Sequence, residues 1–93
     1  MSSRVTLELF EPISFGSERI TKLEIRRFKA KDLRSIRDPD NMSVSEQLEL
    51  ISTLSGQPMK VIDELDGVDL AKAGEIIRGF SKSGQATGEK TLP

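Results

Sequence analysis

Two runs of alternating apolar and polar residues open the chain, in the sequence RVTLELFEPISFGSERITKLEIRR of residues 4–27. Alternation with period two is typical of a strand with one buried face. Pro12 ends the first strand or confines it to a sheet edge, and Gly16-Ser17 suits a tight hairpin turn. We therefore expect a β-hairpin or small meander, which must pack its apolar face on other elements because an isolated hairpin is marginal in water.

Four short helices are predicted to supply that packing, over residues 30–37, 43–56, 58–65 and 66–80. The clearest start is at Ser43, because Ser43-x-x-Glu46 forms a capping box. Gly56 suits a left-handed cap at the end of the same helix. Asp66 is the expected N-cap of the last helix, and Asp69 lies in its first turn, where the helix dipole favours anions.

A single α+β domain is thus expected over residues 1–80, followed by a flexible tail over residues 81–93, which are rich in Gly, Ser, Thr and Lys. Such a short chain buries only a small core. The apolar positions of the predicted elements give the expected core: Val5, Leu7, Leu9, Leu23, Ile25, Leu33, Ile36, Leu48, Ile51, Leu54, Val61, Ile62, Leu65, Leu70, Ala73, Ile76, Ile77 and Phe80.

The composition argues against an enzyme. The 93 residues include no Cys, His, Trp or Tyr, so thiol chemistry, the commonest general base and the favoured stacking aromatics are missing. A calcium loop around Gly67 fails on register, because its first and twelfth positions would be Ile62 and Ala73. The carboxylates of Asp38 and Asp40 fit a turn. No catalytic, cofactor-binding or metal-binding residue is therefore predicted.

Charge is distributed in two blocks of opposite sign. Residues 19–37 hold eight basic and two acidic residues, a net charge of +6, whereas residues 38–80 hold nine acidic and three basic residues, a net charge of −6. The blocks are either solvated faces that aid solubility, or complementary patches that steer a partner or a second copy of the chain. Nucleic-acid binding by the basic block is disfavoured, because the chain is acidic overall and that block has a single aromatic residue.

Arg26-Arg27-Phe28 lies where the hairpin should lead into the first helix. One interpretation is structural, with one arginine in solvent and its neighbour paired with an acidic helix. The other is a docking patch, since arginine is enriched at interfaces. Methionines supply adaptable apolar contacts. The candidate partner-binding residues are Arg26, Arg27, Phe28, Arg34 and Met59.

The order of short motifs resembles the tail assembly chaperones of Mu-like tailed bacteriophages and prophages. The likeness covers residues 5–80. Its motifs are LEIRR at 23–27, DL at 32–33, LISTLSGQP at 50–58, VIDELDGVD at 61–69, and a last helix that closes at Phe80. One departure is Phe28-Lys29, where the family often has Pro-Thr, so the first helix lacks a side-chain N-cap.

This resemblance implies a non-enzymatic protein that binds the tape-measure protein, assists tail tube assembly and recruits tail tube subunits. It implies action in the host cytoplasm, without a membrane, and absence from the mature virion. Many such proteins also have a longer, frameshifted form. Self-association of the chain is a further expectation from the charge blocks. The alternative function is a small regulatory or nucleic-acid-binding adaptor that uses the basic segment 19–37.

Overall fold

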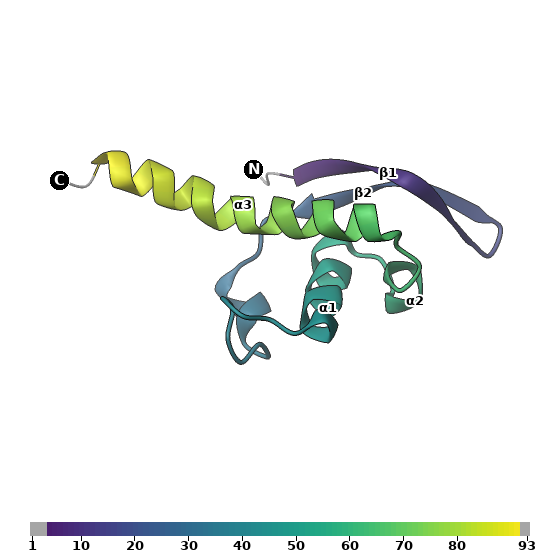
Figure 1. Ribbon diagram of the computed structural model, residues 1–93, viewed down its shortest axis with the longest axis horizontal. Helices are drawn as coiled ribbons and strands as arrows, with labels where there is room; N and C mark the ends of the chain where they lie inside the picture. Colours follow the sequence, from purple (N-terminus) through teal and green to yellow (C-terminus); the bar gives the residue numbers. More distant parts are fainter. Residues whose placement is uncertain (1–3, 92–93) are drawn as a thin grey trace.

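The computed structural model describes the backbone of residues 4–91 and the side chains of residues 4–80. A two-stranded antiparallel hairpin, β1 (Arg4–Phe15) and β2 (Glu18–Arg26), leads into a 3-10 turn, η1 (Ala30–Leu33). Three α-helices follow: α1 (Val44–Ser55), α2 (Met59–Ile62) and α3 (Gly67–Thr91). In Figure 1 the hairpin and α3 run side by side along the long axis, with α1 below them; α1 contacts β2 and α3 contacts β1. The predicted α+β class is confirmed.

The hairpin turn forms where the sequence predicts it, at Gly16-Ser17. Gly16 has a φ of +63°, a conformation that glycine adopts without steric cost. Farther along, the strands lose their regular pairing, because Glu8 faces Lys22 whereas Ile13 faces Ile20. The four residues 9–12 of β1 therefore lie opposite a single residue of β2. β1 continues through Pro12, since a bulge is a place where a strand tolerates a missing N–H.

The bulge explains two core residues that the sequence analysis omitted. Ile13 and Ile20 pair with each other and are buried, together with Leu23 farther along β2. The spacing of three between Ile20 and Leu23 breaks the period of two, and the irregular pairing absorbs this shift. The prediction for Val5 was wrong: it is 37% exposed, because it lies at the open end of the hairpin, beside the last strand pair of Arg4 with Arg26.

The first predicted helix is also corrected. Residues 30–37 form only the short 3-10 turn η1, because Lys29 at its N-cap position has no side-chain oxygen to accept a backbone N–H. By contrast, α1 begins and ends as predicted: Ser43 Oγ accepts from Glu46 N–H, and Gly56 is left-handed with φ +76°. The third helix is shorter than predicted, at four residues.

α3 starts after Asp66 as predicted but continues as helical backbone to Thr91, where the sequence analysis expected a flexible tail from residue 81. A helix that is already nucleated extends at the cost of ordering one residue per hydrogen bond, which accounts for the extra turns. Phe80, the predicted end of this helix, is a buried core residue within α3. Residues 92 and 93 of the predicted tail lie outside the described residues.

The core lies between the inner face of the hairpin and the three helices. Besides Ile13 and Ile20, Leu50 is a buried residue that the sequence analysis did not include. Several residues predicted to be fully in the core pack against it while partly exposed. These are Leu9, Leu33, Ile36, Leu48, Leu65, Leu70 and Ile76. The fully buried apolar residues are Leu7, Ile13, Ile20, Leu23, Ile25, Leu50, Ile51, Leu54, Val61, Ile62, Ala73, Ile77 and Phe80.

Candidate partner-binding site

Arg26, a predicted partner-binding residue, is held within the domain. Its two terminal nitrogens donate to the two carboxylate oxygens of Asp32 at 3.0 and 3.1 Å. Asp32 also accepts from the backbone N–H of Lys29 at 2.7 Å, and its side chain is only 4% exposed. A fork-to-fork ion pair of this kind fixes geometry as well as adding energy. Arg26 therefore anchors η1 to the end of β2.

Arg27 and Phe28 contact α3 at Phe80. The Arg27 guanidinium carbon lies 5.2 Å from the centre of the Phe80 ring, and Arg27 Nη2 donates to the Phe80 carbonyl oxygen at 2.9 Å. The Phe28 ring lies 6.4 Å from the same ring at 59°. This cation–aromatic and tilted aromatic packing connects the loop after β2 with α3.

A hollow of about 280 Å³ opens beside this cluster, between the loop after β2, α1 and α3. We call it the Phe28 groove. Its lining is mostly apolar, with one acidic and one basic residue. The lining residues are Phe28, Leu33, Pro39, Asp40, Met42, Leu50, Ile77 and Arg78. The groove can receive an apolar side chain from a partner.

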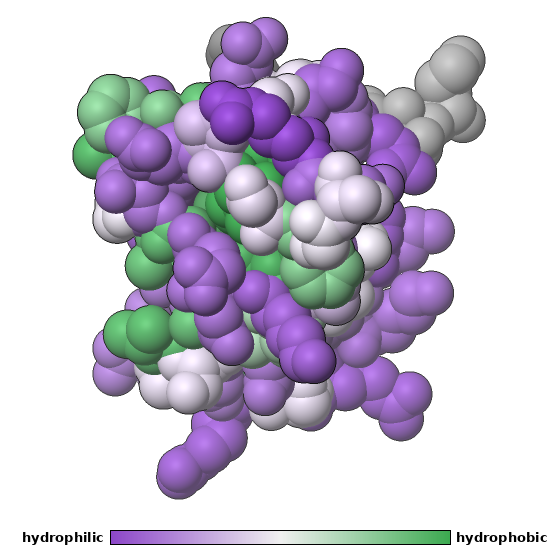
Figure 2. Space-filling model, turned by 90° about the vertical axis from the view of Figure 1, so that its right-hand side faces the viewer, coloured by the Kyte–Doolittle hydropathy of each residue, from purple (hydrophilic) through white to green (hydrophobic). Residues whose placement is uncertain are grey.

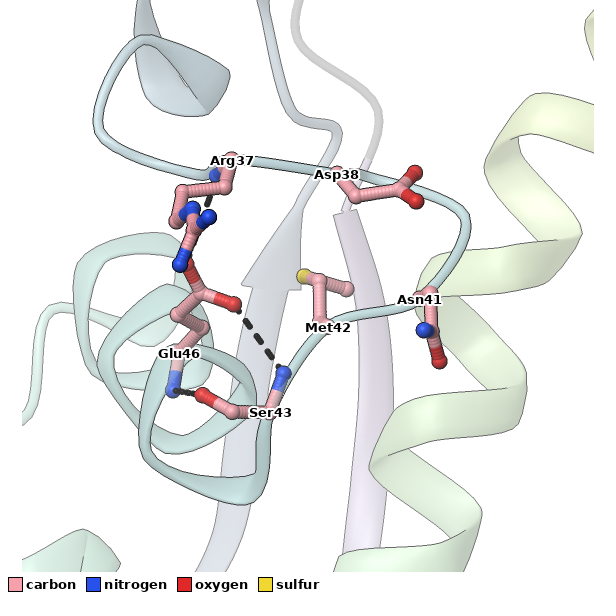
Figure 3. A pocket seen from close by; sticks show the side chains of 6 residues that line it. All are labelled: Arg37, Asp38, Asn41, Met42, Ser43 and Glu46. Carbon is pink, nitrogen blue, oxygen red and sulfur yellow. Dashed lines mark hydrogen bonds between the residues drawn. The ribbon is translucent and has the colours of Figure 1, made fainter.

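A second, more polar hollow of about 560 Å³ adjoins it at Met42 (Figure 3). Two of its polar side chains, those of Ser43 and Glu46, cap α1. Glu46 accepts from Ser43 N–H at 3.0 Å and from Arg37 N–H at 3.3 Å, while Ser43 Oγ accepts from Glu46 N–H at 3.1 Å. Figure 3 shows the Met42 side chain inside the curve of this loop. This hollow is therefore formed by the loop that caps α1, and Met42 lines both the hollow and the Phe28 groove.

Two carboxylates in this region have lowered pKa values. The pKa of Asp32 lies below its ordinary value, chiefly because Arg26 donates hydrogen bonds to the charged form. The pKa of Glu46 is lowered chiefly by the backbone N–H of Ser43, and next by that of Arg37. Both carboxylates are consequently charged at neutral pH and serve to hold the loop that borders the groove.

Replacing Asp32 with asparagine should reduce the free energy of unfolding by about 1–3 kcal/mol at pH 6, because it leaves Arg26 without its ion partner. A carboxylate with a lowered folded-state pKa stabilises the fold above its unfolded-state pKa, near 4, and loses that contribution as the pH falls through the folded-state value. The difference between the wild type and Asp32→Asn should therefore shrink between pH 5 and pH 2. Urea unfolding at several pH values measures it.

Asp63→Asn is the matched control for that series. Asp63 is exposed, and within the described side chains its carboxylate accepts no hydrogen bond. Its replacement should change the stability little over the same pH range. A gap between the wild type and Asp32→Asn that stays constant down to pH 2 would contradict the assigned role of the ion pair.

The remaining predicted partner residues are Arg34 and Met59. Arg34 is exposed at the C-cap of η1. Met59 begins α2, which Figure 1 places toward the hairpin tip, far from the loop after β2. Figure 2 views that end of the molecule, where a mostly hydrophilic surface carries separate apolar patches. The structure therefore brings together Arg26, Arg27 and Phe28 but not Met59.

Sequence reasoning missed a carboxylate that joins the two halves of the fold. Asp69 in the first turn of α3 is completely buried, and its two oxygens accept from the backbone N–H groups of Phe10 at 2.8 Å and Glu11 at 3.1 Å. These N–H groups belong to the bulge, where regular strand pairing is lost. A buried carboxylate is tolerated when its oxygens are hydrogen-bonded in this way. Asp69 thus connects α3 to β1.

Pro12 and the acidic first turn of α3 were the available signals for that contact, but nothing local links them across nearly sixty residues.

Among the residues with described side chains, no group of three potential metal ligands is found. Within the described part of the chain, no helix is long and apolar enough to cross a bilayer. The arrangement at the Phe28 groove is suited to binding rather than to chemistry.

A comparison with known families gives a match over most of the chain. A family described as "Phage tail assembly chaperone proteins, E, or 41 or 14" matches residues 6–82, which include the hairpin, the Phe28 groove and the packed part of α3. Searches of curated proteins and of solved structures gave no significant match. The matched range agrees with the range of 5–80 over which the resemblance was drawn from sequence motifs.

Proposed function

This chain belongs to the phage tail assembly chaperone family, and from that membership we propose that it binds the tape-measure protein and assists assembly of the tail tube. The family match over residues 6–82 carries this proposal. It also makes the chain a non-catalytic assembly protein with phage tail proteins as partners, in agreement with the sequence-based prediction. In this role the tape-measure protein is the proposed client and the tail tube protein is the proposed second partner.

The Phe28 groove supports a binding role of this kind. A chaperone for a helical client needs an accessible apolar surface, and helices commonly dock through apolar side chains in such grooves. The groove is mostly apolar, lies on the surface and is lined by Phe28, which follows Arg27 in the chain; both are candidate partner-binding residues. Arg34, which is exposed at the C-cap of η1, is a further proposed contact with the client.

We further propose that residues 1–80 form the client-binding unit and that residues 81–93 form a separate tail. The proposed site of action is the host cytoplasm, before the virion is complete. These parts follow from the family's role in tail assembly and from the composition of residues 81–93, which are rich in Gly, Ser, Thr and Lys. A membrane has no part in the proposed role, and neither nucleic acid nor a cofactor is required for it.

Co-expression with a tape-measure protein from the same genome tests the proposal. We expect more soluble tape-measure protein when the chain is present, and recovery of the two proteins together on a tag carried by either one. A chain of the same composition with residues 4–80 shuffled controls for the expression load. If the tape-measure protein is equally soluble with the chain and with the shuffled control, and the two do not co-purify, the proposed function is wrong.

A further inference from the structure

The Phe28 groove is large enough to receive a side chain of another polypeptide. Its volume of about 280 Å³ falls just under the range of about 300–1,000 Å³ that is usual for small-molecule sites. Phe28, Leu33 and Met42 contribute apolar surface and are only partly buried by their own domain. A large apolar side chain of another polypeptide would complete their burial.

The charges next to the groove indicate which polypeptide fits. Arg78 lines the groove, and Arg27 lies beside Phe28 at the Phe80 ring. Among the side chains that the structure describes, neither arginine is within 4.0 Å of a carboxylate oxygen. Two of the nearby carboxylates are already engaged: Asp32 pairs with Arg26, and Glu46 caps α1. Arg27 and Arg78 therefore remain available to carboxylates of a partner, with Asp40 as the acidic residue of the lining.

We propose that the Phe28 groove binds an amphipathic helical segment of the client that inserts one large apolar side chain and places carboxylates against Arg27 and Arg78. This proposal rests on the proposed function, because it names the part of the client that is recognised. The apolar anchor supplies burial, while the flanking carboxylates set the orientation and speed the encounter. Asp40, the acidic residue of the lining, repels such a segment and so disfavours binding at the wrong register.

Methionine methyl groups give a direct readout on the folded, unmodified protein. The chain has three methionines, of which Met42 lines the groove and Met59 lies in α2. The probes are overlapping peptides of the tape-measure protein, each about 20 residues long, which is enough for five helical turns. With carbon-13 methyl labels on methionine, peptides that bind should shift the Met42 signal and leave Met59 unchanged. The bound peptides should carry a large apolar residue flanked by Asp or Glu.

Charge variants test the electrostatic part. Arg78→Glu should weaken binding of those peptides by about tenfold or more, because it turns an attraction into a repulsion at the rim. Arg19→Glu is the matched control: it makes the same charge change on β2, opposite Ser14 near the hairpin turn, and should alter the affinity less than about twofold. Asp40→Asn should strengthen binding, and raised salt should weaken it.

The outcomes separate the two proposals. If the whole tape-measure protein co-purifies but its peptides leave the Met42 signal unmoved, the groove assignment is wrong while the proposed function stands. If no tape-measure protein binds, both are wrong. If the Met42 signal moves with the concentration of the chain alone, a second copy occupies the groove. That result, or equal losses for Arg78→Glu and Arg19→Glu, overturns the proposed client chemistry.

Discussion

Replacing Asp69 with alanine should lower the free energy of unfolding by about 3 kcal/mol or more, a large part of the stability of a domain this size. The variant removes the only side chain seen to accept from Phe10 N–H and Glu11 N–H, and leaves both donors in a part-buried bulge. A buried donor without an acceptor costs about 1–3 kcal/mol. The packing of α3 on β1 depends on the same contact. Urea unfolding measures the loss, and faster amide exchange at Phe10 and Glu11 locates it.

Asp66→Ala provides a matched control at the start of the same helix. Asp66 also accepts from a backbone N–H, that of Val68 at 2.9 Å, but the bond is local and exposed. Loss of such a cap costs about 1 kcal/mol. If both alanine variants lose the same small amount of stability, Asp69 is an ordinary helix-start residue and its assigned role in joining α3 to β1 is wrong.

Local signals in the sequence predicted most of the fold. The turn at Gly16, the capping box at Ser43 and the left-handed cap at Gly56 each depend on residues within one turn of chain, and all three are present. A local feature also explains why the first predicted helix is absent: Lys29 has no side-chain oxygen with which to cap it. Arg26 instead donates hydrogen bonds to Asp32 and holds the chain in a tight 3-10 turn.

The candidate site was only partly predictable. Arg27 and Phe28 were singled out as neighbours in sequence, but the groove beside them is completed by Met42 and Ile77, which come from elsewhere in the chain. Met59 was predicted as a partner-binding residue, whereas Met42 is the methionine that lines the groove. Composition gave no means of choosing between these two methionines. Contacts between distant parts of the chain decide which residues line the groove. A single sequence indicates such contacts only where a residue has no evident local partner.

Phe80→Ala should cost about 3–5 kcal/mol of stability, as expected for removing a buried aromatic ring from a core. Phe80 is 6% exposed, and its ring contacts both Phe28 and the guanidinium of Arg27. The alanine variant therefore leaves a cavity and removes the surface on which the loop after β2 is held. In this variant we expect amide exchange to accelerate, relative to the wild type, more in that loop than in α1. Thermal and urea unfolding measure the overall loss.

Phe10→Ala is the control with the same change in side chain. Phe10 is 62% exposed, and the contact that anchors it is its backbone N–H, which alanine keeps. A surface substitution of this kind should change stability by only about 0.5 kcal/mol. Equal losses for the two variants would show that Phe80 is not the junction between α3 and the loop. A loss confined to Phe80→Ala, together with a displaced Met42 methyl signal in the absence of any peptide, would show that the aromatic cluster sets the shape of the groove. The order of α3 and the capacity of the groove to bind would then depend on the same side chain.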